Sequence, residues 1–250
     1  MSTAATAPPK RGAFIVFEGL DRSGKSTQVA RLVEGLTARG VKAVRAGFPE
    51  RPEGPGTGAL LWMVMIHPRG VGALDRTLTT GKMIDSYLSQ KADLDDRAIH
   101  LLFSANRWER ANQILEDLSN GVTVVCDRYA FSGIAFSVIK GISWTWCQSP
   151  DMGLPAPDLV LFLSIPPSAA ASRGGFGQER YETSEVQLAV KDVFEQLGRT
   201  MDDGVWNVVD ADRTVDAVEA DVRARVEAVL ASARLDGDVK RLWDDERATS

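Results

Sequence analysis

A glycine-rich loop between an apolar run and an amphipathic helix constrains this chain more than any other feature. Residues 13–17 are apolar, residues 19–26 fit the pattern Gly-x-x-x-x-Gly-Lys-Ser, and residues 25–38 carry apolar side chains at helical spacing. Glycines in such a loop let backbone N–H groups converge on phosphate oxygens, and the helix N-terminus adds positive potential. Lys25 would reach the outer phosphates, and the Ser26 hydroxyl would bind an accompanying magnesium ion. The segment therefore predicts a nucleoside triphosphate site.

The loop also carries an arginine, Arg22, among the amides that would bind phosphate. A planar guanidinium suits bidentate phosphate contact, and a solvated surface charge is a poor explanation for it at this place. We expect the nucleotide phosphates to be bound by the following residues: Gly19, Asp21, Arg22, Ser23, Gly24, Lys25, Ser26 and Thr27.

Composition narrows the class of protein. A length of 250 residues suits one α/β domain, and the formal net charge of −5 argues against a general nucleic-acid-binding surface. The longest apolar runs fall short of the 18 residues that a membrane span needs. Two cysteines, Cys126 and Cys147, make no disulfide framework, which fits a reducing compartment such as the cytoplasm, with the nucleus as a second location.

Strand-like and helix-like segments alternate along the chain, which predicts an α/β fold: a doubly wound parallel sheet with helices on both faces. The predicted strands are residues 13–17, 41–48, 122–127, 158–165 and 206–209. The predicted helices are residues 25–38, 81–90, 95–118, 129–139, 184–201 and 212–233, and residues 144–157 read as irregular. We place one domain at residues 11–235, between a disordered tail at 1–10 and a C-terminal tail at 236–250.

Residues 51–75 break the alternation. They contain five glycines and three prolines around one apolar run, 59–66, and read as an inserted loop of unusual length for a compact domain.

Two further segments carry charges suited to phosphoryl transfer. Asp127 follows an apolar strand, where an acid beside the phosphate-binding loop helps to hold magnesium, and Arg128 comes next; the alternative is a simple strand-end cap. Residues 172–182 are rich in glycine and arginine and are a candidate lid, with Arg173 and Arg180 as groups that approach the phosphates on closure. A flexible polar surface loop is the alternative for this segment.

Five motifs in order resemble those of thymidylate kinases of the eukaryotic kind. They lie at residues 17–28, 101–109, 125–133, 150–160 and 173–182, and the resemblance runs from about residue 11 to 230 apart from the insertion. It implies a P-loop kinase fold, Mg²⁺ with ATP as phosphoryl donor, dTMP as acceptor, and a homodimer formed through helices of the domain.

The resemblance also implies roles for single residues. Phe103 would stack on the thymine ring and Arg107 would hydrogen-bond its exocyclic oxygen, although a phenylalanine on a helix is more often core. Asp21 would meet the sugar 3′-hydroxyl, and Tyr181 would clash with a 2′-hydroxyl unless it only packs on the core. The implied catalytic residues are Arg22, Lys25, Asp127 and Arg128, with Ser26 and Asp127 at the metal. The implied acceptor-binding residues are Asp21, Phe48, Arg76, Phe103, Arg107, Arg128, Ser132, Gly133, Phe136 and Tyr181.

The insertion departs from the family pattern. Deleting residues 51–75 would place Arg76 directly after Phe-Pro-Glu at 48–50, as the family pattern requires. We therefore favour Arg76 as the arginine that binds the acceptor phosphate. Arg51, which already follows Glu50, is the other residue that matches the pattern. The insertion is either a real solvent loop or an intron retained in the gene model. Peptides of the native protein that cover 59–66 would exclude the second hypothesis, and peptides that join Glu50 to Arg76 would support it.

Rival functions remain open at this point. One is a kinase of thymidine itself or of a broader set of deoxynucleotides; three arginines near the acceptor (Arg76, Arg107 and Arg128) favour a phosphorylated acceptor instead. Another is a nucleotide-binding homologue whose activity is impaired by the insertion. His67 and His100 are isolated in the sequence and predict no metal site.

Overall fold

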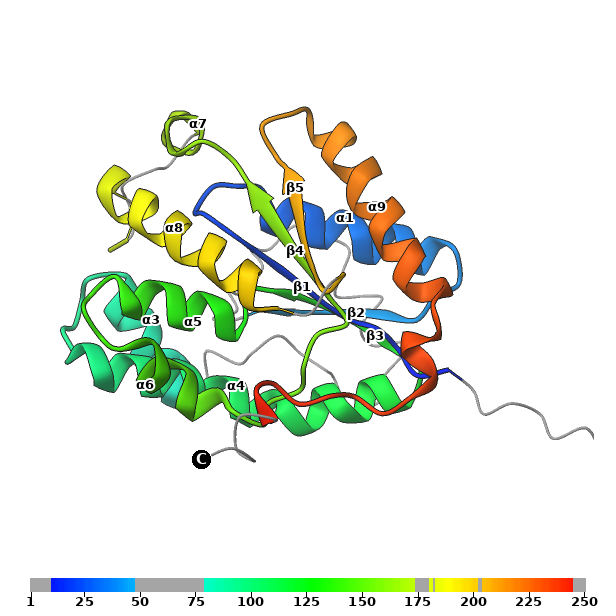
Figure 1. Cartoon of the computed structure of the whole chain (residues 1–250), viewed down its shortest axis with the longest axis horizontal. Helices are drawn as coiled ribbons and strands as arrows, with labels where there is room; N and C mark the ends of the chain where they lie inside the picture. Colours follow the sequence, from blue (N-terminus) through cyan, green and yellow to red (C-terminus); the bar gives the residue numbers. More distant parts are fainter. Residues whose placement is uncertain (1–9, 48–78, 174–179, 182, 202–203, 245–250) are drawn as a thin grey trace, which may run out of the picture.

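A parallel sheet of five strands runs through the part of the chain that the structure describes, in the order β2-β3-β1-β4-β5 (Figure 1). This computed structural model describes residues 10–47, 79–173, 180–181, 183–201 and 204–244. The strands are β1 (Phe14–Gly19), β2 (Ala43–Gly47), β3 (Thr123–Asp127), β4 (Leu159–Ser164) and β5 (Trp206–Asp210). All neighbouring strands pair in parallel, so their carboxyl ends meet at one edge.

Helices cover both faces of the sheet (Figure 1). The α-helices are α1 (Lys25–Ala38), α3 (Thr79–Leu88), α4 (Asp96–Ser119), α5 (Ala130–Val138), α6 (Trp144–Gln148), α7 (Pro167–Ser172), α8 (Ser184–Thr200) and α9 (Val215–Ala231). Two short 3₁₀ segments are η1 (Ser149–Asp151) and η2 (Ala233–Asp236). The doubly wound α/β fold predicted from the sequence is thereby confirmed.

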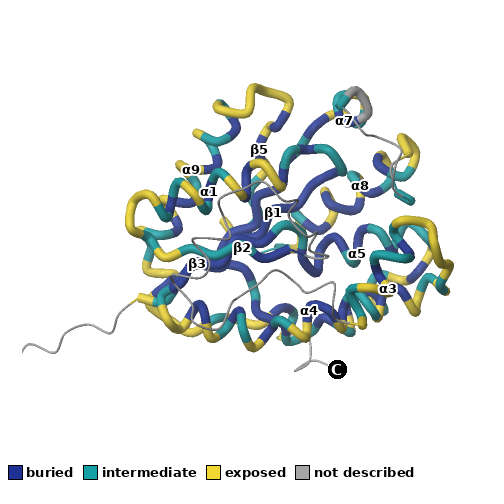
Figure 2. The backbone as a smooth tube through the Cα atoms, turned by 180° about the vertical axis from the view of Figure 1, so that it is seen from behind, coloured by how far each residue is buried: buried dark blue, intermediate teal, exposed yellow. Residues whose placement is uncertain are grey.

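Alternate residues of the central strands enter two separate cores. In β1, Phe14 and Val16 face the helices α4, α5 and α8, whereas Ile15 and Phe17 face α1 and α9. All six residues of β1 are buried, as Figure 2 shows for the centre of the sheet. A strand buried on both sides has no polar face, which explains why these strands read as continuous apolar runs.

The segment predicted to be irregular, 144–157, is partly helical, so that prediction was wrong for α6 and η1. Helix α7 was missed altogether. Each of these helices spans fewer than two turns, so hydrophobic periodicity has too few residues to appear in the sequence.

The folded domain also extends beyond the predicted boundary at residue 235. Leu242 is 2% exposed and belongs to the core on the α4–α5 side, and Trp243 packs against that core. Leu242 N–H donates to Leu154 O over 2.8 Å, and Gly153 N–H donates to Leu242 O over 2.9 Å. Residues 237–244 are therefore part of the folded unit rather than a tail. Within the described residues, the structure contains no helix that is both long and apolar enough to span a bilayer.

Candidate active site

The predicted phosphate-binding loop joins β1 to α1 at the carboxyl edge of the sheet. Gly19 has a φ of 143°, and a Cβ at this position would lie 2.6 Å from the Leu163 carbonyl oxygen. Gly24, with a φ of 95°, immediately precedes α1, and Arg22 also adopts a positive φ of 63°. Only glycine fits the first position without a clash. The loop therefore turns tightly and leaves the N-terminus of α1 facing a cavity.

The ammonium group of Lys25 is buried inside this loop. Its Nζ donates to Leu20 O over 2.6 Å, to Gly19 O over 3.1 Å and to Ser23 Oγ over 3.3 Å. Burial, together with the nearby Arg128 guanidinium, lowers the pKa of Lys25 to about 8. The loop thus holds a cation at the place where phosphate negative charge is expected.

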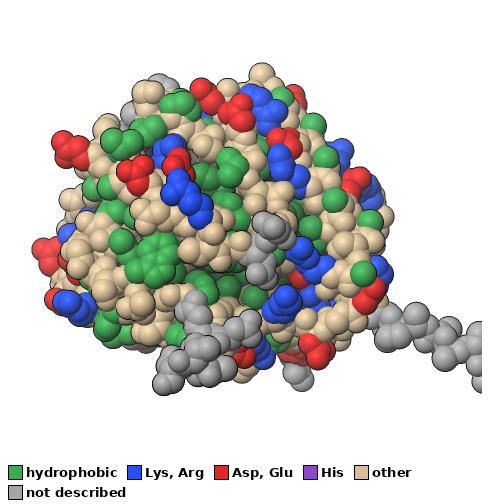
Figure 3. Space-filling model, in the orientation of Figure 1, with side chains coloured by type: hydrophobic (Ala, Val, Ile, Leu, Met, Phe, Trp, Pro, Cys, Tyr) green, Lys and Arg blue, Asp and Glu red, His purple; other side chains and the backbone are tan. Residues whose placement is uncertain are grey.

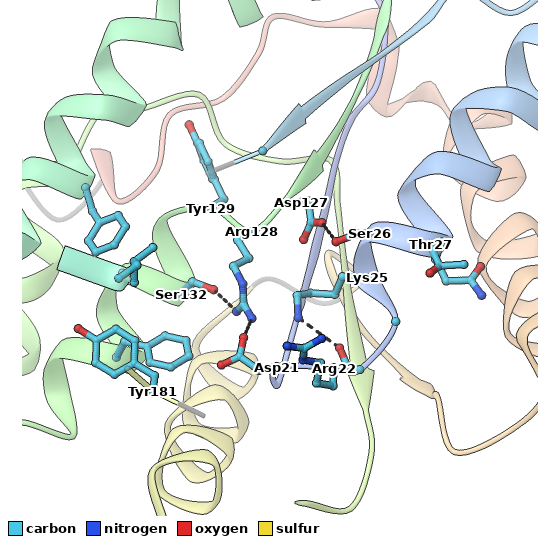
Figure 4. Close-up of a pocket in the computed structure, with 18 of the residues that line it drawn as sticks. Asp21, Arg22, Lys25, Ser26, Thr27, Asp127, Arg128, Tyr129, Ser132 and Tyr181 are labelled. Atoms are coloured by element: carbon cyan, nitrogen blue, oxygen red, sulfur yellow. Dashed lines mark hydrogen bonds and ion pairs between the residues drawn. The ribbon is translucent and has the colours of Figure 1, made fainter. Parts of the chain in front are cut away.

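The two predicted metal residues lie side by side. Ser26 Oγ donates to Asp127 Oδ2 over 2.6 Å, and Arg45 Nη2 lies 3.9 Å from the same carboxylate oxygen (Figure 4). Parallel pairing places Asp127 opposite Phe17, one strand away from the loop. A hydroxyl and a carboxylate are oxygen ligands of the kind that Mg²⁺ takes alongside water and substrate phosphates. Among the described residues there is no cluster of three or more His, Cys, Asp or Glu side chains suited to a metal. The donor set therefore fits an ion that arrives with a nucleotide.

Arg128 links the loop to the other half of the site. It pairs with Asp21, and its Nη1 donates to Ser132 Oγ over 3.1 Å and to Gly19 O over 3.2 Å (Figure 4). Its guanidinium carbon also lies 5.6 Å from the centre of the Phe136 ring. The residue has a φ of 66°, an uncommon conformation for a side chain this large. Such strain, held by several contacts, is typical of a functional position.

A buried carboxylate, Glu18, holds the backbone that follows Arg128. It accepts hydrogen bonds from Tyr129 N–H over 2.9 Å, from Ser132 N–H over 3.1 Å and from the Ser132 hydroxyl over 2.6 Å. Tyr129 is the N-cap of α5 and makes no cap with its own side chain, so Glu18 caps this helix from another strand. Burial raises the pKa of Glu18, although the Arg128 charge opposes that rise.

Gln187 on α8 fixes the loop from the opposite side. Its side-chain oxygen accepts from Asp21 N–H over 2.8 Å, and its Nε2 donates to Asp21 Oδ2 over 2.8 Å and to Tyr181 O over 3.0 Å. Gln187 is fully buried. One amide therefore joins the phosphate-binding loop to the residue expected at the sugar.

A cavity of about 860 Å³ extends from the loop to a wall formed by α4 and α5. The predicted acceptor residues that line it are Asp21, Phe103, Arg107, Arg128, Ser132, Gly133, Phe136 and Tyr181. The predicted phosphate-binding residues Asp21 to Thr27 line the same cavity. The structure thus brings both predicted sets together, while Phe48 and Arg76 lie outside the described residues and the choice between Arg51 and Arg76 stays open.

Arg107 is buried, and one edge of its guanidinium is fixed. Its Nε donates to Asp151 Oδ1 over 3.0 Å, and its Nη2 donates to Asp151 Oδ2 over 2.5 Å. Ser104 Oγ donates to the same carboxylate over 2.7 Å. A Cβ on Gly133 would approach Arg107 Nη2 to 2.8 Å and Nη1 to 3.2 Å. The guanidinium therefore occupies the space beside Gly133, with its orientation set by a carboxylate behind it.

The two arginines of the predicted lid have different positions. Arg173 lies against the phosphate-binding loop, where its Nη1 donates to Arg22 O over 2.7 Å and its Nη2 donates to Ala211 O over 3.0 Å. Arg180 instead donates to Asp93 over 2.5 Å and lies 4.2 Å from the centre of the Tyr87 ring. The approach of Arg180 to the phosphates on lid closure stays a prediction.

Comparisons with known proteins agree with this site. Residues 75–222 match the family model described as thymidylate kinase. The chain is 45% identical to thymidylate kinase of Homo sapiens, over 90% of this chain and 94% of that protein. It is 49% identical to the Schizosaccharomyces pombe thymidylate kinase, over 75% of this chain and 77% of that protein. The chain belongs to the thymidylate kinase family.

Membership of this family makes the chain a nucleoside monophosphate kinase that uses ATP. The family model begins at residue 75, but the thymidylate kinase of Danio rerio is 42% identical over 94% of this chain, a span that takes in the phosphate-binding loop. The structure of thymidylate kinase from Candida albicans superposes with a TM-score of 0.72 at 32% identity, covering 93% of this chain and 99% of that one. That enzyme is described as having a broad substrate specificity and a novel structural element.

Three residues of this thymidylate kinase site, Glu18, Asp151 and Gln187, escaped the sequence reasoning. Glu18 left a signal, because it is a charged residue inside an otherwise apolar strand. Asp151 stands in the family motif at 150–160, but nothing in the sequence showed that it would hold Arg107. Gln187 left no signal, since a single polar residue on a helix is unremarkable. His100, read as a plain helix residue, is buried between Ser137 Oγ at 2.7 Å and Cys147 O at 2.8 Å.

Proposed function

We propose that this chain transfers the γ-phosphoryl group of ATP to the phosphate of dTMP and releases ADP and dTDP. One observation carries the proposal: a single cavity is lined by the phosphate-binding loop at one end and by Phe103 and Arg107 at the other, with Arg128 between them. The thymidylate kinase relatives support the choice of acceptor.

The donor is held by the loop and the N-terminus of α1. Lys25 and Arg22 place positive charge beside the β- and γ-phosphates, where negative charge builds up during transfer. Mg²⁺, when bound by Ser26 and Asp127, supplies further neutralisation of the donor phosphates. Arg173 on the Arg22 carbonyl supports the loop from outside.

The acceptor is held by α4, α5 and the turn after β3. Phe103 offers a flat apolar surface for the base, and Arg107, which carries only donors, suits an exocyclic oxygen rather than an amino group. We assign Asp21 to the sugar 3′-hydroxyl. Arg128 would release part of its contact with Asp21 and bind the acceptor phosphate in its place.

The transfer itself needs no general base, because the acceptor phosphate oxygen is already ionised at neutral pH. That oxygen attacks the γ-phosphorus in line, the bond to the β–γ bridging oxygen breaks, and its electron pair leaves with ADP. The protein residues named above hold the two substrates close together and stabilise the negative charge that develops during transfer.

Two variants test these roles. Arg128→Ala should lower kcat with dTMP by roughly 10²-fold or more, because it removes a charge from the transferring group. Phe103→Ala should raise KM for dTMP and leave KM for ATP nearly unchanged. Circular dichroism verifies that each variant is folded. A near-wild-type kcat for Arg128→Ala, or an unchanged dTMP dependence for Phe103→Ala, would contradict the assignment.

The family matches do not favour the two alternatives raised by the sequence. An impaired homologue would bind ATP without turnover, and a broader deoxynucleotide kinase would accept other monophosphates as readily as dTMP. A panel of acceptors separates both from dTMP phosphorylation.

We also propose a homodimer. Three large apolar side chains, Met83, Leu101 and Trp108, are 40%, 46% and 41% exposed on α3 and α4. Leu101 and Trp108 lie two turns apart on one helix, so they share a face that a second copy would cover. Leu101→Glu should shift the protein to monomers in sedimentation velocity, and an unchanged dimer would contradict this interface.

Small molecules are the partners that the surface supports. Lys and Arg are interspersed with Asp and Glu on the face that Figure 3 shows, rather than gathered into a basic area there. We propose ATP and dTMP as partners, no nucleic acid or membrane, and a cytoplasmic location with the nucleus as a second. Imaging of a tagged chain tests the location.

A further inference from the structure

Lys140, two residues beyond the end of α5, brings together side chains from three other parts of the chain. Its Nζ donates to Asp96 Oδ1 over 2.7 Å, to Tyr181 Oη over 2.8 Å and to Tyr87 Oη over 3.0 Å. It also lies 5.0 Å from the centre of the Tyr181 ring and 5.4 Å from that of Tyr87. These residues come from α4, the end of the candidate lid and α3, so one ammonium ties α5 to all three.

The hydrogen-bond donors of the Lys140 ammonium group are all used within the protein. An ammonium group has three N–H donors, and all three are used on these partners. Although Lys140 lines the cavity, it therefore has no donor left for a nucleotide phosphate. Its side chain is 16% exposed, so its contacts are largely shielded from water and stronger than surface contacts. Lys140 acts on the site through its neighbours.

The neighbour that matters is Tyr181. Its hydroxyl accepts from Lys140 and donates to Tyr87 Oη over 3.1 Å, so its one proton is already used within the protein. Its ring packs at 5.1 Å from the Phe136 ring, and its carbonyl accepts from Gln187, which also holds Asp21. Figure 4 shows Tyr181 on the same side of the cavity as Ser132.

Tyr181 lines the same cavity as Asp21 and Phe103, which we assign to the acceptor sugar and base, so we assign its ring to the level of the sugar. A fixed ring there leaves little room for an added 2′-hydroxyl, whereas a ring free to move would accept one. We propose that Lys140 is a positioning residue that fixes the Tyr181 ring against the acceptor sugar and so sets the discrimination between deoxyribose and ribose. This inference rests on the proposed function of the site.

The test compares two acceptors that differ only in the 2′-hydroxyl: dTMP and 5-methyluridine 5′-monophosphate. The ratio of their kcat/KM values is measured for the full chain, for Lys140→Met, for Tyr181→Phe and for the double variant. Lys140→Met keeps the length and the apolar stem but removes the charge and all three donors. Lys91→Met, on an exposed lysine between α3 and α4, is the matched control.

We expect the deoxy-to-ribo ratio to fall about tenfold in either single variant, as for the loss of a hydrogen bond to a charged group, and no further in the double variant. Lys140→Arg, which keeps a cation with several donors, should retain most of the ratio. Should Lys140→Met fail to fold, Tyr181→Phe and Lys140→Arg still measure the coupling.

An unchanged ratio in folded Lys140→Met would overturn the proposal, as would a double variant whose ratio falls by the product of the two single effects. Failure of the proposed function looks different, because the wild-type chain would then not phosphorylate dTMP at all.

Discussion

At the scale of single residues, Lys25 combines a positive charge with near-complete burial. The unfolded chain keeps the proton on this lysine up to the ordinary pKa of 10.5, whereas the folded chain releases it near pH 8. Between these values the unfolded state binds more protons, so raising the pH stabilises the folded state. Below pH 8 the buried ammonium is charged, which lowers the free energy of unfolding. The same charge is the one that binds the nucleotide phosphates.

The first prediction compares wild type with Lys25→Met. Relative to this variant, the free energy of unfolding of the wild type should rise by up to about 3 kcal/mol as the pH increases from 8 to 10.5, because the cost of burying the charge disappears. Urea unfolding of both proteins at several pH values measures this difference. Titration of all other groups is common to the two proteins and cancels. A difference that is independent of pH would show that Lys25 is not perturbed.

The second prediction concerns Gly133. A methyl group there would press on the Arg107 guanidinium, which Asp151 prevents from moving back. Gly133→Ala should therefore raise KM for dTMP by roughly tenfold or more, by displacing the group that meets the base. Steady-state kinetics with each substrate varied in turn measure this, and KM for ATP is the internal control. An equal rise in both KM values would point to a general loss of structure instead.

Sequence reasoning predicts single residues where local chemistry marks them. The phosphate-binding loop and Asp127 follow from spacing and from position at a strand end. Gln187 does not, because its contact with Asp21 spans 166 positions in the sequence and depends on how α8 packs. The same holds for Asp151, whose partner Arg107 lies 44 positions away.

At the scale of elements, long segments could be predicted and short ones could not. The 24-residue helix α4 was predicted from its periodicity, and in the structure Asp95 caps it by accepting from Arg97 N–H and Ala98 N–H. The short helices α6 and α7 form because the chain around them is packed, which propensity alone does not reveal. The segment at 237–244 was read as a tail because its three apolar residues that join the core, Val239, Leu242 and Trp243, are too few to show a helix or strand period.

The third prediction tests that segment. Leu242→Ala should lower the free energy of unfolding by about 2–4 kcal/mol, because a fully buried leucine leaves a cavity against the α4–α5 core. Asp238→Ala, a change at an exposed position in the same segment, should have almost no effect. Denaturant unfolding of the two variants measures this. Equal stabilities would mean that residues 237–244 do not belong to the cooperative unit.

At the scale of the whole molecule, the doubly wound sheet places the ends of β1 and β3 next to each other. Parallel pairing of Phe17 with Asp127 brings the acid and Arg128 to the phosphate-binding loop, although more than a hundred residues separate them. The helices α4 and α5 form the wall of the cavity at the end where the acceptor is proposed to bind. The alternation of strands and helices predicts a parallel sheet, and ligands of such sheets bind beyond the carboxyl ends of the strands. The strand order that puts β3 beside β1 depends on long-range packing and was not predicted.

The most direct measurement is turnover by the full chain with Mg·ATP and each of dTMP, dUMP, UMP and thymidine, following ADP and the phosphorylated product. We expect fast formation of dTDP, weak use of UMP and no use of thymidine, since the site suits a phosphorylated deoxyribose acceptor. ATP binding without turnover of any acceptor would contradict the proposed function.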